Sequence, residues 1–163
     1  MNNNIAIIIL AAGLGTRMKS DKAKVLHTVL EKPMITYVTE AAIRVAGNEV
    51  VVVVGHQADK VRETVLETED VKFSYQNKQL GTGHAVMCAM PNISDNIKKV
   101  VILCGDVPLL SWKTISDLVD THEKNENDIT VLAINLDKPK EEVSLDKDDP
   151  RRQIQDAINK IKN

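Results

Sequence analysis

Runs of apolar residues alternate along this chain with longer segments whose apolar positions recur at helical spacing. The runs are rich in Val and Ile, so we expect strands at Ile5–Leu10, Glu49–Val54, Val71–Tyr75, Val100–Leu103 and Ile129–Ile134. One helix should begin after Pro33 and end at Gly47, because the apolar positions between them follow helical spacing. Weaker patterns predict further helices over Gln57–Glu67, Gly83–Met90 and Ser111–Glu123.

The alternation of strands and helices predicts an α/β protein with a Rossmann-like, mostly parallel sheet and helices on both faces. The composition agrees, because only 2% of the residues are aromatic and a core of Val, Ile, Leu and Ala is typical of buried parallel strands. Ligands of such sheets bind beyond the carboxyl ends of the strands. We therefore expect the polar segments after the first, third and fourth strands to lie along one rim.

The overall charge gives no attraction for nucleic acid or for an anionic membrane. The chain has 21 basic and 23 acidic residues and a net charge of −2, so any site for an anion must be local. The two cysteines, Cys88 and Cys104, have no metal-ligand spacing, which favours reduced thiols in the cytoplasm. The first apolar run follows no basic residue and is short, so it is interpreted as a strand rather than as a signal peptide.

The segment after the first strand, LAAGLGTRMKSDKAKVL, is both glycine-rich and basic. Gly13 and Gly15 allow backbone N–H groups to approach a phosphate closely, while Arg17 and Lys24 add positive charge. The segment is neither a P-loop, since it lacks Gly-Lys-Ser/Thr at the required spacing, nor a dinucleotide fingerprint, since Met18 stands at the third glycine. It could also be only a tight turn, but its length and charge favour a site for a polyphosphate.

Two further segments carry candidate chemistry. In YQNKQLGTGHA, the side chains of Gln76, Gln79 and Thr82 offer directed hydrogen bonds to a base or ribose, and Gly81 permits close approach. A structural role is favoured for His84, because the sequence pairs it with no other catalytic group. Asp106, in CGDVPLL, is equally compatible with a magnesium ligand facing phosphates and with a residue that shapes the turn or caps the next helix.

Together these segments resemble a known family. LAAGLGTRMKSDKAKVLH is similar to the signature loop of sugar-1-phosphate nucleotidyltransferases, and QLGTGHAV and GDVPLL resemble their bacterial N-acetylglucosamine-1-phosphate uridylyltransferase branch. The resemblance runs from about Ile5 to Leu136. It implies transfer of UMP from UTP to N-acetylglucosamine 1-phosphate, with release of pyrophosphate, in the cytoplasmic supply of peptidoglycan precursors.

The resemblance also implies roles for individual residues. Arg17 and Lys24 would be catalytic, Asp106 would bind Mg²⁺, and Asn159 would contact the sugar. The nucleotide would be held by Leu10, Ala11, Ala12, Gly13, Gly15, Thr16, Gln76, Gln79, Gly81 and Thr82. Such a reaction requires in-line positioning and neutralisation of charge, and it needs no covalent nucleophile.

The chain departs from the family pattern at two places. Ala23 stands where the signature has proline, which should loosen the loop that presents Lys24. After Leu136 the sugar-side segment of the family is missing, and a charged tail over residues 137–163 ends in a predicted helix that we assign to the same domain as the nucleotide-binding core of residues 1–136. The alternatives are a shortened relative that binds a uridine nucleotide without turnover and an interaction protein that pairs through its terminal helix. The sequence leaves the oligomeric state open.

Overall fold

The computed structural model describes residues 4–13, 15 and 20–133 of the chain. The chain divides into two units, Met1–Thr130 and Val131–Asn163, and the fold presented below is that of the first. The predicted terminal helix lies outside the described residues. Within them, no helix combines the length and the apolar character that crossing a bilayer would require.

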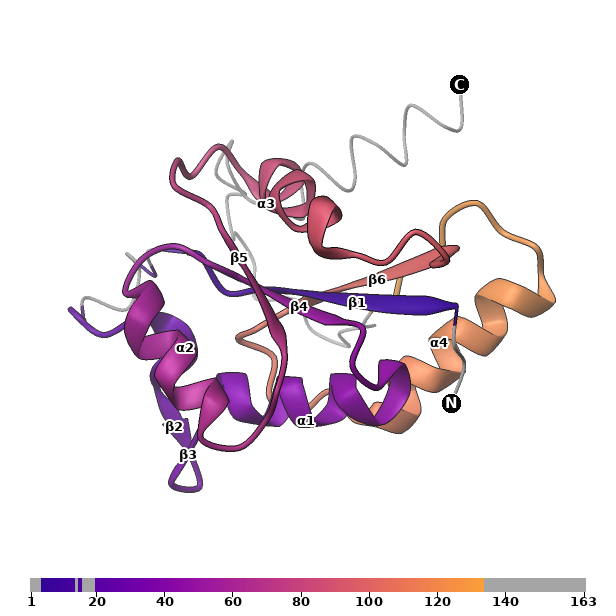
Figure 1. The fold of residues 1–163 in the computed structure, drawn as a ribbon. Coiled ribbons are helices and arrows are strands. Elements are labelled where there is room, and N and C mark those ends of the chain that lie inside the picture. Colours follow the sequence, from indigo (N-terminus) through magenta and orange to yellow (C-terminus); the bar gives the residue numbers. More distant parts are fainter. Residues whose placement is uncertain (1–3, 14, 16–19, 134–163) are drawn as a thin grey trace, which may run out of the picture. The chain divides into compact units, whose positions relative to one another are not determined.

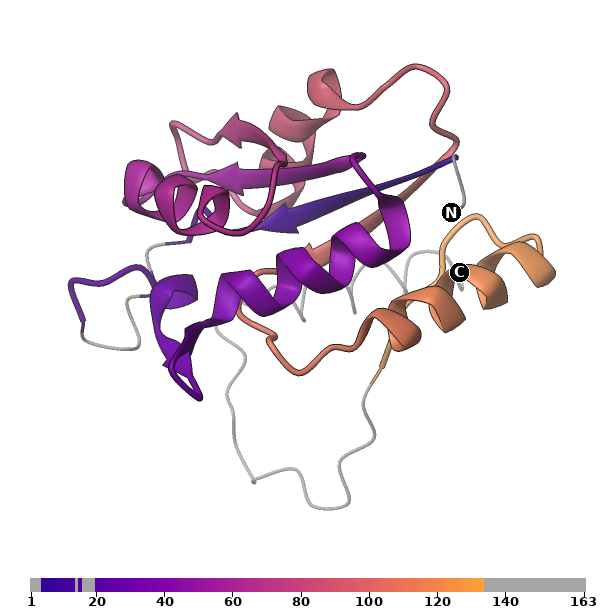
Figure 2. The ribbon, with the colours of Figure 1, turned by 60° about the horizontal axis from the view of Figure 1, so that its bottom comes forward.

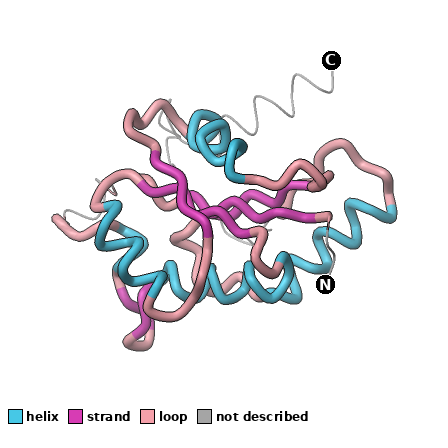
Figure 3. Tube along the Cα trace, viewed as in Figure 1, coloured by secondary structure: helices cyan, strands magenta, loops and turns pink. Residues whose placement is uncertain are grey.

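The strands and helices of the first unit alternate along the chain (Figures 1 and 3). The strands are β1 (Ile5–Leu10), β2 (Thr28–Val29), β3 (Lys32–Pro33), β4 (Val50–Val54), β5 (Lys72–Tyr75) and β6 (Lys99–Cys104). The α-helices are α1 (Met34–Ala46), α2 (Ala58–Leu66), α3 (Thr82–Ala89) and α4 (Trp112–Lys124). Two short 3₁₀ helices, η2 (Lys24–Leu26) and η3 (Met90–Asn92), complete the described elements.

The main sheet has four parallel strands in the order β5-β4-β1-β6. Ile8 on β1 lies beside Val51 on one side and Ile102 on the other, which fixes the register of the three central strands. Strands β2 and β3 form a separate antiparallel hairpin. The prediction of a mostly parallel Rossmann-like sheet is therefore confirmed.

Helices cover both faces of the sheet, as Figures 1 and 2 show. On one face, side chains of α1, α2 and α4 pack against alternate residues of β1 and β4, such as Ile7 and Val52. On the other face, α3 places Ala85 and Ala89 against Ile8. Because both faces are covered, β1 and β4 are uniformly apolar, which is the pattern expected of buried parallel strands.

The limits of two helices follow from local chemistry. Gly47 closes α1 with a φ of 61°, a conformation that favours glycine, and its N–H donates to the carbonyl of Ile43. Ser111 caps α4, because its hydroxyl accepts a hydrogen bond from the N–H of Thr114 at 3.1 Å. The helix predicted over Ser111–Glu123 is thus confirmed, with Ser111 itself as its cap.

The strand predicted over Ile129–Ile134 is wrong for its described part. Residues 129–133 form no strand, and Ile129 is 67% exposed. A run of β-branched residues forms a strand only where another strand pairs with it and other side chains cover it. Residues 129–133 have neither a paired strand nor such a cover.

Candidate functional site

The loops that follow the main strands meet at the carboxyl edge of the sheet, as predicted. The N–H of Gly105, after β6, donates to the carbonyl of Leu10 at 2.9 Å. The side chain of Gln79, after β5, donates through Nε2 to the carbonyl of Ala12 at 2.7 Å. These bonds join the segments after β1, β5 and β6 into one rim.

The strand order places a topological switch point between β1 and β6. The crossovers from β1 to β4 and from β4 to β5 pass over one face of the sheet, through α1 and α2, whereas the connection from β5 to β6 passes over the other, through α3. The strand order therefore reverses between β1 and β6, and α/β sheets commonly bind their ligands beyond the carboxyl ends of the strands at such a point.

Lys24 and Asp106 face each other at this switch point. Their Nζ and Oδ2 atoms lie 2.5 Å apart, although 82 positions separate the two residues in the sequence. Both side chains are partly exposed, at 44% and 30%, so ligands can reach them from solvent. The structure brings together these two predicted residues, while Thr16 and Arg17 lie outside the described residues, as does Asn159.

Gly15 makes room for the residue that follows the loop. Its φ of 62° is unfavourable for other residues, and a Cβ added to it would lie 3.0 Å from the Cβ of Lys24. The glycine thus allows the backbone at residue 15 to lie directly against Lys24.

Gln57 anchors the segment that carries Lys24. Its Oε1 accepts from the N–H of Ala23 at 3.0 Å, and its Nε2 donates to the carbonyl of Asp21. Ala23, which stands where the family signature has proline, is fully buried, and its φ of −53° is close to the value that a proline ring imposes. The N–H that a proline would lack is therefore used here to fix the loop.

The Asp106 carboxylate is a hard oxygen donor of the kind that a divalent cation shared with phosphates uses. Among the described residues, no three His, Cys, Asp or Glu side chains cluster as a metal site. A single carboxylate beside a phosphate-binding loop is nevertheless a usual protein contribution to a magnesium site, since phosphates and waters supply the other ligands.

Burial raises the pKa of the neighbouring Cys104 thiol, and the Asp106 carboxylate raises it further, so this cysteine is protonated at neutral pH.

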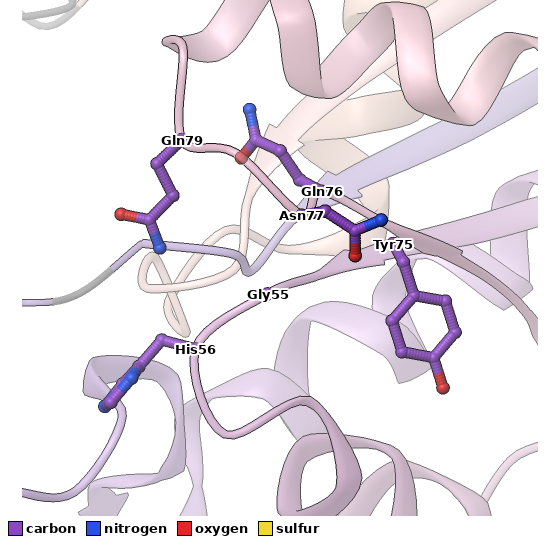
Figure 4. Close-up of a pocket in the computed structure, with 6 residues that line it drawn as sticks. All are labelled: Gly55, His56, Tyr75, Gln76, Asn77 and Gln79. Carbon is purple, nitrogen blue, oxygen red and sulfur yellow. The ribbon is translucent and has the colours of Figure 1, made fainter.

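An open cavity of about 470 Å³ lies at the ends of β4 and β5 (Figure 4). Its lining residues come from the loop after β4, from the end of β5 and from the loop that follows β5, and they are Gly55, His56, Tyr75, Gln76, Asn77 and Gln79. Of these, Gln76 is buried, whereas Gln79 is exposed and reaches across to the segment after β1. Gly81 and Thr82 stand at the start of α3, directly after this loop.

Sequence reasoning missed the contribution of the loop after β4. A Cβ on Gly55 would lie 3.0 Å from the Cβ of Ala12 and 3.1 Å from the backbone oxygens of Ala12 and Gln76, so any larger residue would have to displace the two neighbouring loops. The N–H of His56 also donates to the carbonyl of Ala12, at 3.4 Å. The available signal was positional, because Gly55 directly follows a buried strand that ends at the same rim.

A doubly wound parallel sheet with a basic glycine-rich loop at its switch point defines a nucleotide-binding α/β domain. More specifically, the chain belongs to the family of the MobA-like NTP transferase domain, whose sequence profile matches residues 7–155.

Curated relatives extend this result. The chain is 46% identical over 136 residues to the bifunctional protein GlmU of Geobacter metallireducens, and 52% identical over 133 residues to that of Fervidobacterium nodosum. These matches cover 83% and 82% of this chain but only 29% and 28% of the two relatives. The chain thus spans less than a third of the length of these proteins.

Solved structures share the fold. A nucleotidyl transferase from Methanothermobacter thermautotroptrophicus superposes with a TM-score of 0.64 at 23% identity, covering 73% of this chain and 58% of that one. HddC from Yersinia pseudotuberculosis, complexed with GMP-PN, gives a TM-score of 0.60 at 25% identity, over 72% of this chain and 53% of that one. Rv0371c from Mycobacterium tuberculosis, complexed with manganese, gives a TM-score of 0.58 at 19% identity, covering 74% of this chain and 60% of that one.

Proposed function

We propose that the chain transfers UMP from UTP to N-acetylglucosamine 1-phosphate, giving UDP-N-acetylglucosamine and pyrophosphate. The observation that carries this proposal is the Lys24–Asp106 pair at the switch point of the sheet, on the same rim as a cavity with polar amide side chains. A cation for phosphates, a carboxylate for a metal ion and a polar recess for a base are the parts that nucleotidyl transfer requires. The substrates themselves come from the sequence resemblance.

In the proposed reaction, an oxygen of the sugar phosphate attacks the α-phosphorus of UTP. The bond between this phosphorus and the bridging oxygen of the β-phosphate breaks, and pyrophosphate leaves. Lys24 would exchange its contact with Asp106 for a phosphate oxygen, and Arg17 would add a second positive charge. Mg²⁺, held by the freed Asp106 carboxylate, would neutralise further phosphate charge. Backbone N–H groups near Gly13 and Gly15 would approach the phosphates, while Gln76, Gln79 and the start of α3 would hold the uridine.

Pyrophosphate release from UTP, N-acetylglucosamine 1-phosphate and Mg²⁺ tests this proposal. Lys24→Met keeps a long side chain but removes the charge, and it should lower the rate by about two to three orders of magnitude, as loss of one charge-stabilising group typically does. Lys22→Met is the matched control, because Lys22 is exposed in the same segment and should leave the rate unchanged. Asp106→Asn should remove the dependence on Mg²⁺ together with most of the activity.

Two other outcomes would change the conclusion. UTP binding without pyrophosphate release would replace the catalytic proposal by a nucleotide-binding role. An equal effect of Lys24→Met and Lys22→Met would show that the Lys24–Asp106 pair does not belong to the reacting centre.

A further inference from the structure

The side-chain amide of Gln76 is held by two groups of the segment that follows β5. Its Nε2 donates to the carbonyl of Gly81 at 3.0 Å and lies 3.1 Å from Nδ1 of His84. His84 belongs to the first turn of α3, and the sulfur of Cys88, one turn later, lies 3.9 Å from both nitrogens of the ring. The His84 ring is thus placed between the Gln76 amide and the next turn of its own helix.

These contacts indicate both the orientation of the amide and the tautomer of the neutral ring. A backbone carbonyl can only accept, so the atom of Gln76 that faces Gly81 must be the amide nitrogen. Its second proton then points at Nδ1 of His84, which must carry a lone pair, and the ring proton of the neutral histidine is therefore on Nε2. Both amide protons are used in this arrangement.

The Gln76 oxygen is consequently turned away from α3. Among the described residues, no side chain or backbone group donates a hydrogen bond to it, and Gln76 is one of the residues that line the cavity. Figure 4 shows the amide nitrogen of Gln76 directed toward the helix and the oxygen on the side of Gln79. A residue of the cavity lining therefore carries a side-chain acceptor that no described protein group uses.

We propose that His84 is a positioning residue, whose Nδ1 locks the Gln76 amide with its oxygen toward the cavity and so selects a base with a ring N–H. This inference rests on the proposed nucleotide-binding function and specifies how its base is chosen. Uracil carries a donor at N3, which suits the Gln76 oxygen. Cytosine carries a lone pair at N3, which would face that oxygen and leave both acceptors unpaired.

The test compares the equilibrium dissociation constants of UTP and CTP. The wild-type chain should bind UTP more tightly than CTP by about 5- to 150-fold, because bound CTP would leave a buried polar group without a hydrogen-bond partner. In His84→Leu the amide keeps only its Gly81 contact and can turn, so the preference should fall at least about fivefold. His84→Asn places a carbonyl oxygen near the position of Nδ1 and should restore the preference.

Two controls separate positioning from general damage. His122→Leu makes the same replacement in the last turn of α4, where Nδ1 also has a neighbouring partner, Thr130, and it should leave the preference unchanged. In a Gln76→Leu background, His84→Leu should have no further effect on selectivity, because the group through which it acts is gone.

The outcomes distinguish the two proposals. If the wild-type chain binds neither nucleotide, the proposed function fails and takes this inference with it. If the wild-type chain prefers UTP but His84→Leu keeps that preference within twofold, only the role of His84 is overturned. Equal weakening of UTP and CTP in His84→Leu would also overturn it, since that is the effect of a merely structural residue.

Discussion

Replacing Gln57 should both destabilise the chain and slow catalysis, although Gln57 is not among the residues that line the cavity. In Gln57→Ala the buried N–H of Ala23 loses its acceptor, which costs about 1–3 kcal/mol when the group stays unpaired. The second bond, to the carbonyl of Asp21, is exposed to solvent and contributes about 0.5 kcal/mol. We therefore expect the free energy of unfolding to fall by about 2 kcal/mol.

The backbone of Gln57 offers a way to separate hydrogen bonding from strain. Its φ of 53° and ψ of 38° are left-handed, which costs a residue other than glycine about 1 kcal/mol. Gln57→Gly loses the same two bonds but relieves this strain, so it should be about 1 kcal/mol more stable than Gln57→Ala. Gln57→Glu keeps an acceptor for the N–H of Ala23 and loses only the donor, so its effect should be the smallest.

Urea unfolding of the three variants, analysed by linear extrapolation, measures these differences. Pyrophosphate release at saturating UTP should also fall about tenfold in Gln57→Ala, because Lys24 directly follows the anchored residue. In an Ala23→Pro background the Ala23 donor no longer exists, so Gln57→Ala should cost less there than in the parent chain. If Gln57→Ala unfolds at the same urea concentration as the parent chain, the reasoning about this anchor is wrong.

Two further predictions concern the rim and the stability of the sheet. Gly55→Ala should weaken UTP binding at least tenfold in an equilibrium titration, because the new methyl group would push apart the loops on either side. Gly83→Ala is the control, because a methyl group there meets no atom within 4 Å, and this variant should bind UTP normally. Equal effects of the two substitutions on UTP binding would contradict the packing argument. Burial raises the pKa of the Glu49 carboxyl, but hydrogen bonds from Ser94 and Lys72 outweigh this effect and leave the pKa below its ordinary value. The Glu49 carboxylate therefore stabilises the folded chain at pH values above about 4.3, the pKa of a glutamate in the unfolded chain. This stabilisation is lost as the pH falls through the pKa of Glu49 in the folded chain. Glu49→Gln should accordingly lower the urea midpoint at pH 7 and not at pH 3, and a loss of equal size at both values would refute the assignment.

The fold was largely predictable because its pattern is local. A strand covered on both faces must be apolar throughout, and β1 and β4 accordingly appear in the sequence as unbroken runs. The limits of α1 follow from Pro33 and Gly47, whose backbone preferences act without reference to the rest of the chain. The run beginning at Ile129 shows the limit of this logic, because composition alone does not reveal whether a partner strand will cover it.

The site was predictable in its location and not in its contacts. The chain direction of parallel strands places Lys24 and Asp106 at one edge, and the sequence predicted both residues as functional. Their direct contact, across 82 positions, depends on side-chain geometry that no spacing encodes. The same holds for the Gln76–His84 bond, for which the sequence indicated only a structural role of the histidine.

The loop after β4 explains why the two halves of the site keep their relative position. Gly55 fits between the segments after β1 and β5. The next two residues form hydrogen bonds with the segment after β1: His56 with Ala12 near its beginning, and Gln57 with Ala23 near its end. None of these three residues has a chemical role in the proposed reaction. A left-handed conformation at Gln57 is tolerated because the bonds on both sides over-determine it, as is usual where a backbone is held under strain near a functional site. The groups proposed for the phosphates and those proposed for the base are therefore aligned through residues 55–57. A substitution in this segment should affect both the affinity for UTP and the rate of transfer.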